Sequence, residues 1–184
     1  MSRIVPILFS PLMMRALISG EKSQTRRLSS SPLSKLKTGD RLYTREAFRA
    51  PAYVDHISPA NICASLPIDY EADKTAFNAS ARLRPGIHQP RFMSRVTLTV
   101  TDVKRERLQD ITAGDALAEG VLSFKNARPE ITNFTHDPRR LFEILWDSLH
   151  GANPGEAWAD NPEIVAPVFS AECVNIDQIG QVRG

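Results

Sequence analysis

Residues 20–27 read Gly-Glu-Lys-Ser-Gln-Thr-Arg-Arg, and this octad decides how the rest of the chain is interpreted. It places three cations, Lys22, Arg26 and Arg27, among hydroxyl and amide side chains. Because guanidinium groups can fork onto phosphate oxygens, Arg26 and Arg27 are candidate phosphate-binding residues. A lysine that is partly buried beside two guanidiniums has a lowered pKa, so Lys22 could act as a base toward the Thr25 hydroxyl. The alternative is a basic loop that faces solvent and has no chemical role.

The octad lies in a strongly basic part of the chain. Residues 1–50 carry ten Lys or Arg side chains and three acidic ones, although the whole protein has a formal net charge of only +2. Such a local excess of positive charge favours a surface for phosphates over an ordinary solvated face, which is the alternative. Arg45 and Glu46 follow on an expected strand and are further candidate substrate-binding residues. Glu46 has a second interpretation, as the ion-pair partner of an arginine.

The composition is that of one ordinary folded domain spanning residues 1–184. The chain is 42% hydrophobic and 24% charged, which excludes disorder of the whole protein. Cys63 and Cys173 are only two and lie far apart, which excludes a disulfide scaffold. No apolar run approaches the roughly 20 residues that a membrane helix needs. Met1–Ser10 lacks the layout of a signal peptide, so we expect a cytoplasmic protein without a membrane partner.

Hydrophobic periodicity and capping residues predict the order of strands and helices. Strands are expected at residues 4–9, 42–48, 68–71, 94–103 and 164–174, and helices after Ser10, Thr112 and Asp137. Residues 49–92 are rich in proline and lack a long apolar stripe, which indicates an irregular insertion draped over the core. Strands outnumber helices and do not alternate with them. We therefore predict an α+β fold, a mostly antiparallel barrel with helices packed at its ends.

The strand at residues 94–103 has the clearest alternation of apolar and polar side chains. The apolar positions are Val96, Leu98 and Val100, and the polar positions are Thr97, Thr99 and Thr101. This pattern predicts one buried face and one polar face. In the last strand, Pro167 indicates an edge position or a bulge, because proline cannot donate to the ladder.

Other common catalytic motifs are missing from the sequence. It contains no glycine-rich phosphate loop and no Gly-x-Ser-x-Gly elbow. Its four histidines are scattered without the short spacing of metal ligands, so we expect no metal site and no cofactor. The octad is therefore the most informative segment for any chemistry.

The pattern Gly20-x-Lys22-x-x-x-x-Arg27 is similar to the GxKxxxxR signature of the ASCH family (activating signal cointegrator homology). Residues 38–42, Thr-Gly-Asp-Arg-Leu, resemble the family's turn into the next strand, and residues 84–96 and 141–151 resemble its phage and prophage branch. The resemblance covers most of the chain outside the insertion. It implies a barrel like that of PUA RNA-binding domains.

The resemblance also implies a chemistry. Some small bacterial ASCH proteins are amidohydrolases that remove the acyl group of N4-acetylcytidine, and their catalytic Lys, Thr and Glu match Lys22, Thr25 and Glu119. Lys22 would act as base, or as oxyanion partner if protonated. Thr25 would be the nucleophile or would orient water, and Glu119 would protonate the leaving amine. Two other functions stay open: a non-catalytic module that binds RNA or modified nucleic acid, and a single-strand ribonuclease.

These assignments carry geometric expectations. Lys22, Thr25 and Glu119 should converge on one pocket within a basic cleft, although Lys22 and Thr25 are an odd number of residues apart. A regular strand would point them to opposite faces, so the chain has to turn just after Gly20. As polar cleft residues, all three should be replaceable without loss of the fold. The insertion could narrow, cover or redirect the site. The expected binding partner is a nucleoside or single-stranded RNA. The sequence leaves the oligomeric state open.

Overall fold

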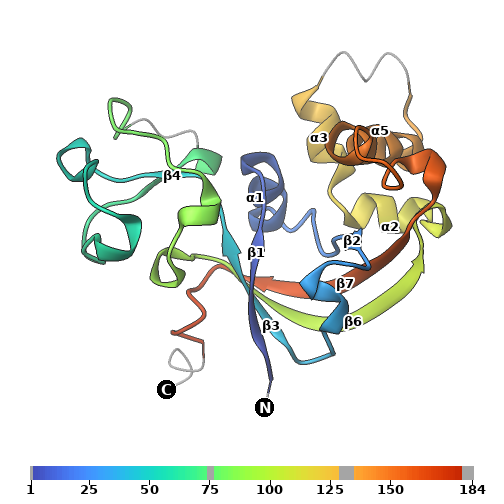
Figure 1. The fold of residues 1–184 in the computed structure, drawn as a ribbon, viewed down its shortest axis with the longest axis horizontal. Helices are drawn as coiled ribbons and strands as arrows, with labels where there is room; N and C mark the ends of the chain where they lie inside the picture. Colours follow the sequence, from blue (N-terminus) through green and yellow to red (C-terminus); the bar gives the residue numbers. More distant parts are fainter. Residues whose placement is uncertain (1, 74–76, 129–134, 180–184) are drawn as a thin grey trace.

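The computed structural model describes residues 2–73, 77–128 and 135–179 (Figure 1). Its main sheet has the strand order β1-β3-β6-β7-β2. The strands are β1 (Ile4–Leu8), β2 (Arg27–Leu28), β3 (Arg41–Arg45), β6 (Thr97–Arg107) and β7 (Glu163–Glu172). Helices pack against this strongly curved sheet, and the predicted α+β class is confirmed.

An arginine side chain joins the two edges of the main sheet. β1 and β2 are the edge strands, and Arg27 of β2 donates from Nη2 to the carbonyl oxygen of Leu8 in β1 over 3.2 Å. The sheet is thus closed toward a barrel by a side chain that spans its open edge. β1 pairs with β3 in parallel and the other pairs are antiparallel, in line with a mostly antiparallel sheet.

The three predicted helices are confirmed, and their caps form as expected. The Ser10 side chain accepts from the first turn of α1 (Pro11–Ile18), and a Thr112–Asp115 capping box begins α2 (Ala113–Ala118). Asp137 caps α5 (Pro138–His150). A further helix, α3 (Val121–Ala127), was not predicted, because Gly120 was taken only as the end of α2. No helix in the described ranges is both long and apolar enough to cross a bilayer.

The long strands differ from expectation in two places. Thr97 was assigned to the polar face but is fully buried, because the chain after β7 covers it and its hydroxyl donates to the Val174 carbonyl over 2.9 Å. β7 lies between β6 and β2, so Pro167 does not mark an edge strand. The bulge was the other interpretation of Pro167. The pairing of β6 with β7 does have a register shift, between Val100 and Asp102 of β6, next to the partner of Pro167.

The insertion at residues 49–92 forms a lobe beside the sheet (Figure 1). The predicted strand at 42–48 breaks, and Phe48 passes into β4 (Phe48–Arg49), which pairs with β5 (Asp69–Tyr70) in a separate two-stranded sheet. Short 3₁₀ turns make up much of the rest, at Ala52–Val54, Pro59–Asn61, Glu71–Asp73, Gly86–His88 and Arg91–Met93. The lobe has an apolar cluster of its own, which includes Phe48, Val54, Ile62 and Met93.

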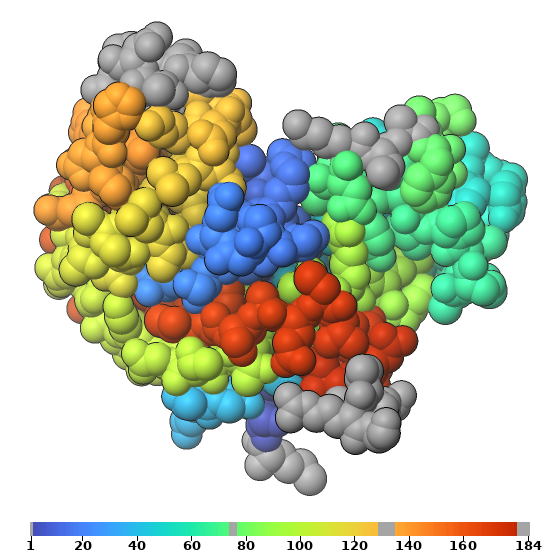
Figure 2. Space-filling model, turned by 180° about the vertical axis from the view of Figure 1, so that it is seen from behind, coloured from blue at the N-terminus to red at the C-terminus, as the bar shows by residue number. Residues whose placement is uncertain are grey.

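Two larger apolar clusters hold the remaining elements together. One packs α1 against the sheet and includes Met14, Leu17, Leu42 and Leu98. The other packs α2, α3 and α5 onto the far ends of β6 and β7 and includes Phe124, Leu141 and Ile164. Figure 2 shows the result from behind: the chain of α1 and the octad lies between the insertion lobe and the lobe of α2, α3 and α5.

Gly86 provides a test of how the insertion lobe docks on the sheet. A Cβ added at Gly86 would lie 2.7 Å from both the Glu46 carbonyl carbon and Leu8 Cδ1, so Gly86→Ala has to displace backbone. We expect the free energy of unfolding to fall by about 1–3 kcal/mol in urea denaturation. The control is Gly114→Ala in α2, where the nearest atom is 3.8 Å away and a gain of up to about 1 kcal/mol is expected. Equal stability of the two variants would contradict the described docking.

Candidate active site

Lys22 lies where the C-terminal ends of two helices meet. After α1 the chain turns at Gly20, whose φ is 79°, as the odd spacing of Lys22 and Thr25 requires. The backbone N–H of Lys22 then donates to the Ala16 carbonyl in α1 over 2.9 Å. Its Nζ donates to the Glu119 carbonyl at the end of α2 over 2.7 Å. A cation is stabilised there, because the carbonyl ends of helices carry partial negative charge.

Lys22 and Glu119 also form a buried ion pair. Lys22 Nζ lies 3.0 Å from Glu119 Oε2, and the two residues are 3% and 4% exposed. Burial removes the ammonium from water and lowers the pKa of Lys22, although the charge of Glu119 acts in the opposite direction. The surroundings of Lys22 thus favour the lowered pKa that the sequence led us to expect, with burial as the main cause.

Arg26 belongs to the same buried network. Its Nη1 donates to Glu119 over 3.3 Å, and its Nη2 donates to Glu106 over 2.5 Å. A third carboxylate, Asp115, lies 3.6 Å from Nη2 and also binds Lys104. The Arg26 side chain is completely buried, so in this structure the network occupies the group that was expected to hold a phosphate.

Thr25 is linked to this network through Arg27. The Thr25 hydroxyl accepts from Arg27 Nη1 over 2.8 Å, and Thr25 is 1% exposed. The Phe9 ring centroid lies 5.8 Å from Lys22 Nζ and 5.6 Å from the Arg27 guanidinium. Among the described hydrogen bonds, none joins Thr25 directly to Lys22 or Glu119. The structure thus brings Lys22 and Glu119 into contact, and it connects Thr25 to Lys22 only indirectly, through Arg27 and the Phe9 ring.

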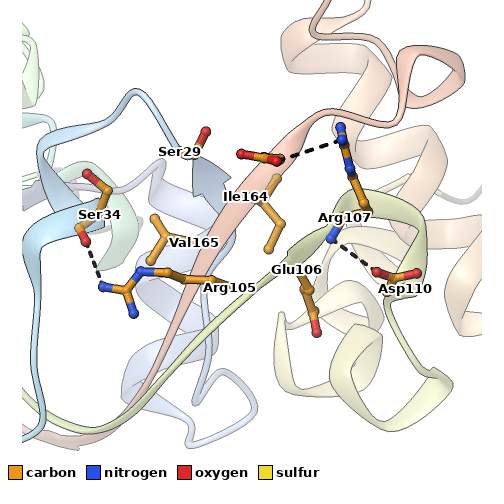
Figure 3. A pocket seen from close by; sticks show the side chains of 9 residues that line it. Ser29, Ser34, Arg105, Glu106, Arg107, Asp110, Ile164 and Val165 are labelled. Atoms are coloured by element: carbon orange, nitrogen blue, oxygen red, sulfur yellow. Dashed lines mark hydrogen bonds and ion pairs between the residues drawn. The ribbon is translucent and has the colours of Figure 1, made fainter.

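The expected open cleft is not what surrounds these three residues. Each is at most 4% exposed, and neither of the two described pockets is lined by any of them. The larger pocket, of about 420 Å³, lies between β2, β6 and β7 (Figure 3). Glu106 lines it and contacts Arg26, which connects the pocket to the buried network. The three side chains are part of the packed interior, so we expect that replacing them lowers the stability of the protein.

Arg45 and Glu46 have separate surroundings. Arg45 donates to the Tyr43 hydroxyl over 3.3 Å and to the Ile87 carbonyl over 3.4 Å. Glu46 is 1% exposed and pairs with Arg95, whose Nε and Nη2 lie 2.8 and 3.0 Å from its oxygens. Burial raises the pKa of Glu46, and the hydrogen bonds and charge of Arg95 oppose that shift. Glu46 thus pairs with an arginine, which was one of its two interpretations.

Sequence reasoning did not identify several members of the network. Phe9 looked like the end of a strand, and Asp115 was recognised only as a helix cap. Glu106 has no local signal, because its partner Arg26 is 80 residues away. Within the described ranges, no group of three or more His, Cys, Asp or Glu side chains is arranged to hold a metal ion.

A double-mutant cycle tests how much the Lys22–Glu119 pair contributes to folding. Removing one partner of a buried pair leaves the other charge uncompensated, so Lys22→Met and Glu119→Gln should each lower the free energy of unfolding by about 3–5 kcal/mol. In urea denaturation, the free energy of unfolding of the double variant should fall by less than the sum of the losses in the two single variants. The matched control is Lys104→Met, because Lys104 is 38% exposed and its pair with Asp115 is worth about 1 kcal/mol or less. Equal losses for Lys22→Met and Lys104→Met would refute the structural role.

No model of a protein family matches the chain, and no curated protein does. Among solved structures, it is similar to protein EF3133 from Enterococcus faecalis V583, described with the family model DUF984, at 10% identity and a TM-score of 0.40, covering 93% of this chain and 80% of that one. It is also similar to an ASCH domain from Lactobacillus crispatus JV V101, at 11% identity and a TM-score of 0.40, covering 92% and 79%.

Proposed function

We propose that this protein hydrolyses an N4-acyl group from a cytosine base, in a nucleoside or in RNA, and that Lys22, Thr25 and Glu119 are its reacting residues. One observation carries the proposal. Lys22 and Glu119 are 97 residues apart in the chain, yet they form a buried pair, and Thr25, whose hydroxyl binds Arg27, is buried as well. These are the three positions that the resemblance to ASCH amidohydrolases assigns to catalysis.

The buried pair can supply both an acid and a base. If a proton moves from Lys22 Nζ to Glu119 Oε2, across 3.0 Å, the pair becomes a neutral amine and a carboxylic acid. Burial favours the neutral amine of Lys22, because it penalises the charged ammonium. The lowered pKa of Lys22 is the direction that a general base near neutral pH requires.

Hydrolysis then returns the pair to its starting state. The amine of Lys22 takes a proton from water as the water oxygen bonds to the acyl carbon. The bond from the acyl carbon to N4 breaks, and Glu119 gives its proton to the leaving amine. Thr25 orients the water, or attacks first and forms an ester that water cleaves in the same way. One water is consumed, the acid and the cytosine amine are released, and the ion pair re-forms.

Substrate binding requires a conformational change at this site. Because Lys22, Thr25 and Glu119 are each at most 4% exposed, an acylated base can reach them only when the residues that cover them move. Such opening and closing steps are common in enzymes that exclude water from the reaction. The buried state described here would correspond to the closed form of the site.

A non-catalytic module that binds RNA is the second candidate. Arg27 and Arg45 favour this function, because no described ion pair includes either side chain and their charges could therefore bind phosphate groups. In that case, the buried pair would act only as a structural link between helices. A single-strand ribonuclease is a third candidate that would use the same basic surface.

Thr25 offers the sharpest test of the hydrolase, because Thr25→Val removes the hydroxyl and keeps the shape. We expect the purified protein to release cytidine from N4-acetylcytidine, followed by chromatography. Thr25→Val should lose about 100-fold or more of that activity, and Thr25→Ser should retain most of it. Circular dichroism should show that both variants are folded.

Two results would contradict the proposal. One is a wild-type protein that cleaves none of a panel of acylated cytosines and cytidines, which would leave the binding module as the better account. The other is a Thr25→Val variant that turns over N4-acetylcytidine as fast as the wild type does.

A further inference from the structure

A small basic and apolar patch lies next to the candidate active site, at the end of β1. We define the Leu8 patch as Leu8, Arg27, Arg45 and Ile87. Arg45 is the register partner of Leu8 in the β1–β3 pair, and Arg27 donates to the Leu8 carbonyl. The patch therefore brings together the two edges of the main sheet and the insertion lobe.

Arg27 connects the patch to the candidate reacting residues. Its Nη1 binds the Thr25 hydroxyl over 2.8 Å, and its Nη2 binds the Leu8 carbonyl over 3.2 Å. One guanidinium therefore reaches from Thr25 to the patch. A ligand whose reacting group lies at Thr25 would have its next group, a few bonds away, over the patch.

Arg45 has unused hydrogen-bonding capacity. Of the five N–H groups of a guanidinium, the described contacts of Arg45 use one on Nη1 and one on Nη2, both to neutral oxygens. Its Nε is buried and has no hydrogen-bond partner among the described residues. The buried Nε is closed to a ligand, but each of Nη1 and Nη2 keeps a second N–H group that an oxyanion can bind.

The patch carries positive charge that no direct carboxylate contact compensates. Neither Arg27 nor Arg45 belongs to a described ion pair, whereas the nearby Arg91 pairs with Asp177 and Arg95 pairs with Glu46. Burial lowers the pKa of Arg27, and the charge of Glu119, which forms no ion pair with it, opposes that shift. A desolvated cation of this kind is stabilised by an anionic ligand.

The apolar members of the patch remain exposed beside these cations. Leu8 is 51% exposed and Ile87 is 63% exposed. Gly86 packs so closely on Leu8 that an added Cβ would lie 2.7 Å from Leu8 Cδ1, so the turn that carries Ile87 lies against Leu8. Apolar surface next to an anion site suits a ligand with a flat apolar part and a charged group.

We propose that the Leu8 patch binds a phosphate group carried by the substrate, with Arg45 as its main ligand and Arg27 as the second. The phosphate could belong to a nucleotide or to the backbone of RNA, and the chemistry on the protein is the same for both. The inference rests on the proposed function for the position of the base. It makes the preferred substrate a phosphate-bearing cytidine rather than the free nucleoside.

The test measures binding by titration calorimetry at low salt, with cytidine, cytidine 3′-monophosphate, cytidine 5′-monophosphate and single-stranded hexacytidylate as probes. A charge-assisted contact predicts that at least one phosphate-bearing probe binds about tenfold or more tightly than cytidine. The gain should shrink as salt is added. If one monophosphate shows the full gain in affinity, the phosphate that the patch binds belongs to a nucleotide. If only the oligonucleotide shows this gain, the phosphate belongs to the RNA backbone.

Arg45→Gln and Arg41→Gln form a matched pair of variants. Both arginines lie on β3 and, four residues apart, project from the same face about 13 Å from each other. No described ion pair includes Arg41 either. Arg45→Gln should abolish the gain in affinity from the phosphate group, and Arg41→Gln should keep it. Arg27 is left intact, because it also joins β1 and β2.

Three results would overturn the inference. The first is equal affinity for cytidine and all phosphate-bearing probes. The others are an Arg45→Gln variant that keeps the gain in affinity from phosphate, and equal losses of that gain in Arg45→Gln and Arg41→Gln. Failure of the proposed hydrolysis would look different. In that case, the phosphate gain and its dependence on Arg45 would persist while N4-acetylcytidine stays intact. Conversely, if the protein deacylates its substrate without any preference for a phosphate group, the proposed phosphate site is wrong and the proposed hydrolase activity stands.

Discussion

The buried ammonium of Lys22 is the constraint on which the arrangement of this protein depends. It needs negative partners in the interior, and it finds them in the carbonyl end of α2 and the carboxylate of Glu119. Two glycines make that approach possible. Gly20 turns the chain after α1, and Gly120, with φ of 83°, brings α2 so close that an added Cβ would lie 3.1 Å from Ala16. The C-terminal ends of α1 and α2 thus meet at one buried charge.

The same network links the folding of the protein to its proposed chemistry. Arg26 ties Glu119 to β6 through Glu106, and Arg27 ties Thr25 to the open edge of the barrel at Leu8. Residues that would react are therefore also residues that hold helices and strands together. Buried charges with shifted pKa values are typical of functional sites, although structural ion-pair networks produce them too. Stability and activity have to be measured separately for every variant in this network.

Local signals predicted the local structure well. Caps at Ser10, Thr112 and Asp137 located three helices, because capping depends on residues within one turn. The contact of Lys22 with Glu119 followed only from the resemblance to ASCH proteins, since no periodicity relates residues 97 apart. The carboxylates around Arg26 and the burial of Thr97 were missed. Both depend on which distant segments pack together, and a single sequence does not encode that in any short pattern.

The central claim is that Lys22 is held in a desolvated environment that favours its neutral form. The most direct test is an NMR pH titration of the Lys22 side chain in lysine-labelled protein, with its signal assigned by its loss in Lys22→Met. Burial predicts a midpoint below the ordinary lysine value of 10.5. A midpoint at or above 10.5 would show that the attraction of Glu119 outweighs desolvation. Lys22 would then be a structural cation, and the account of it as a base would be contradicted.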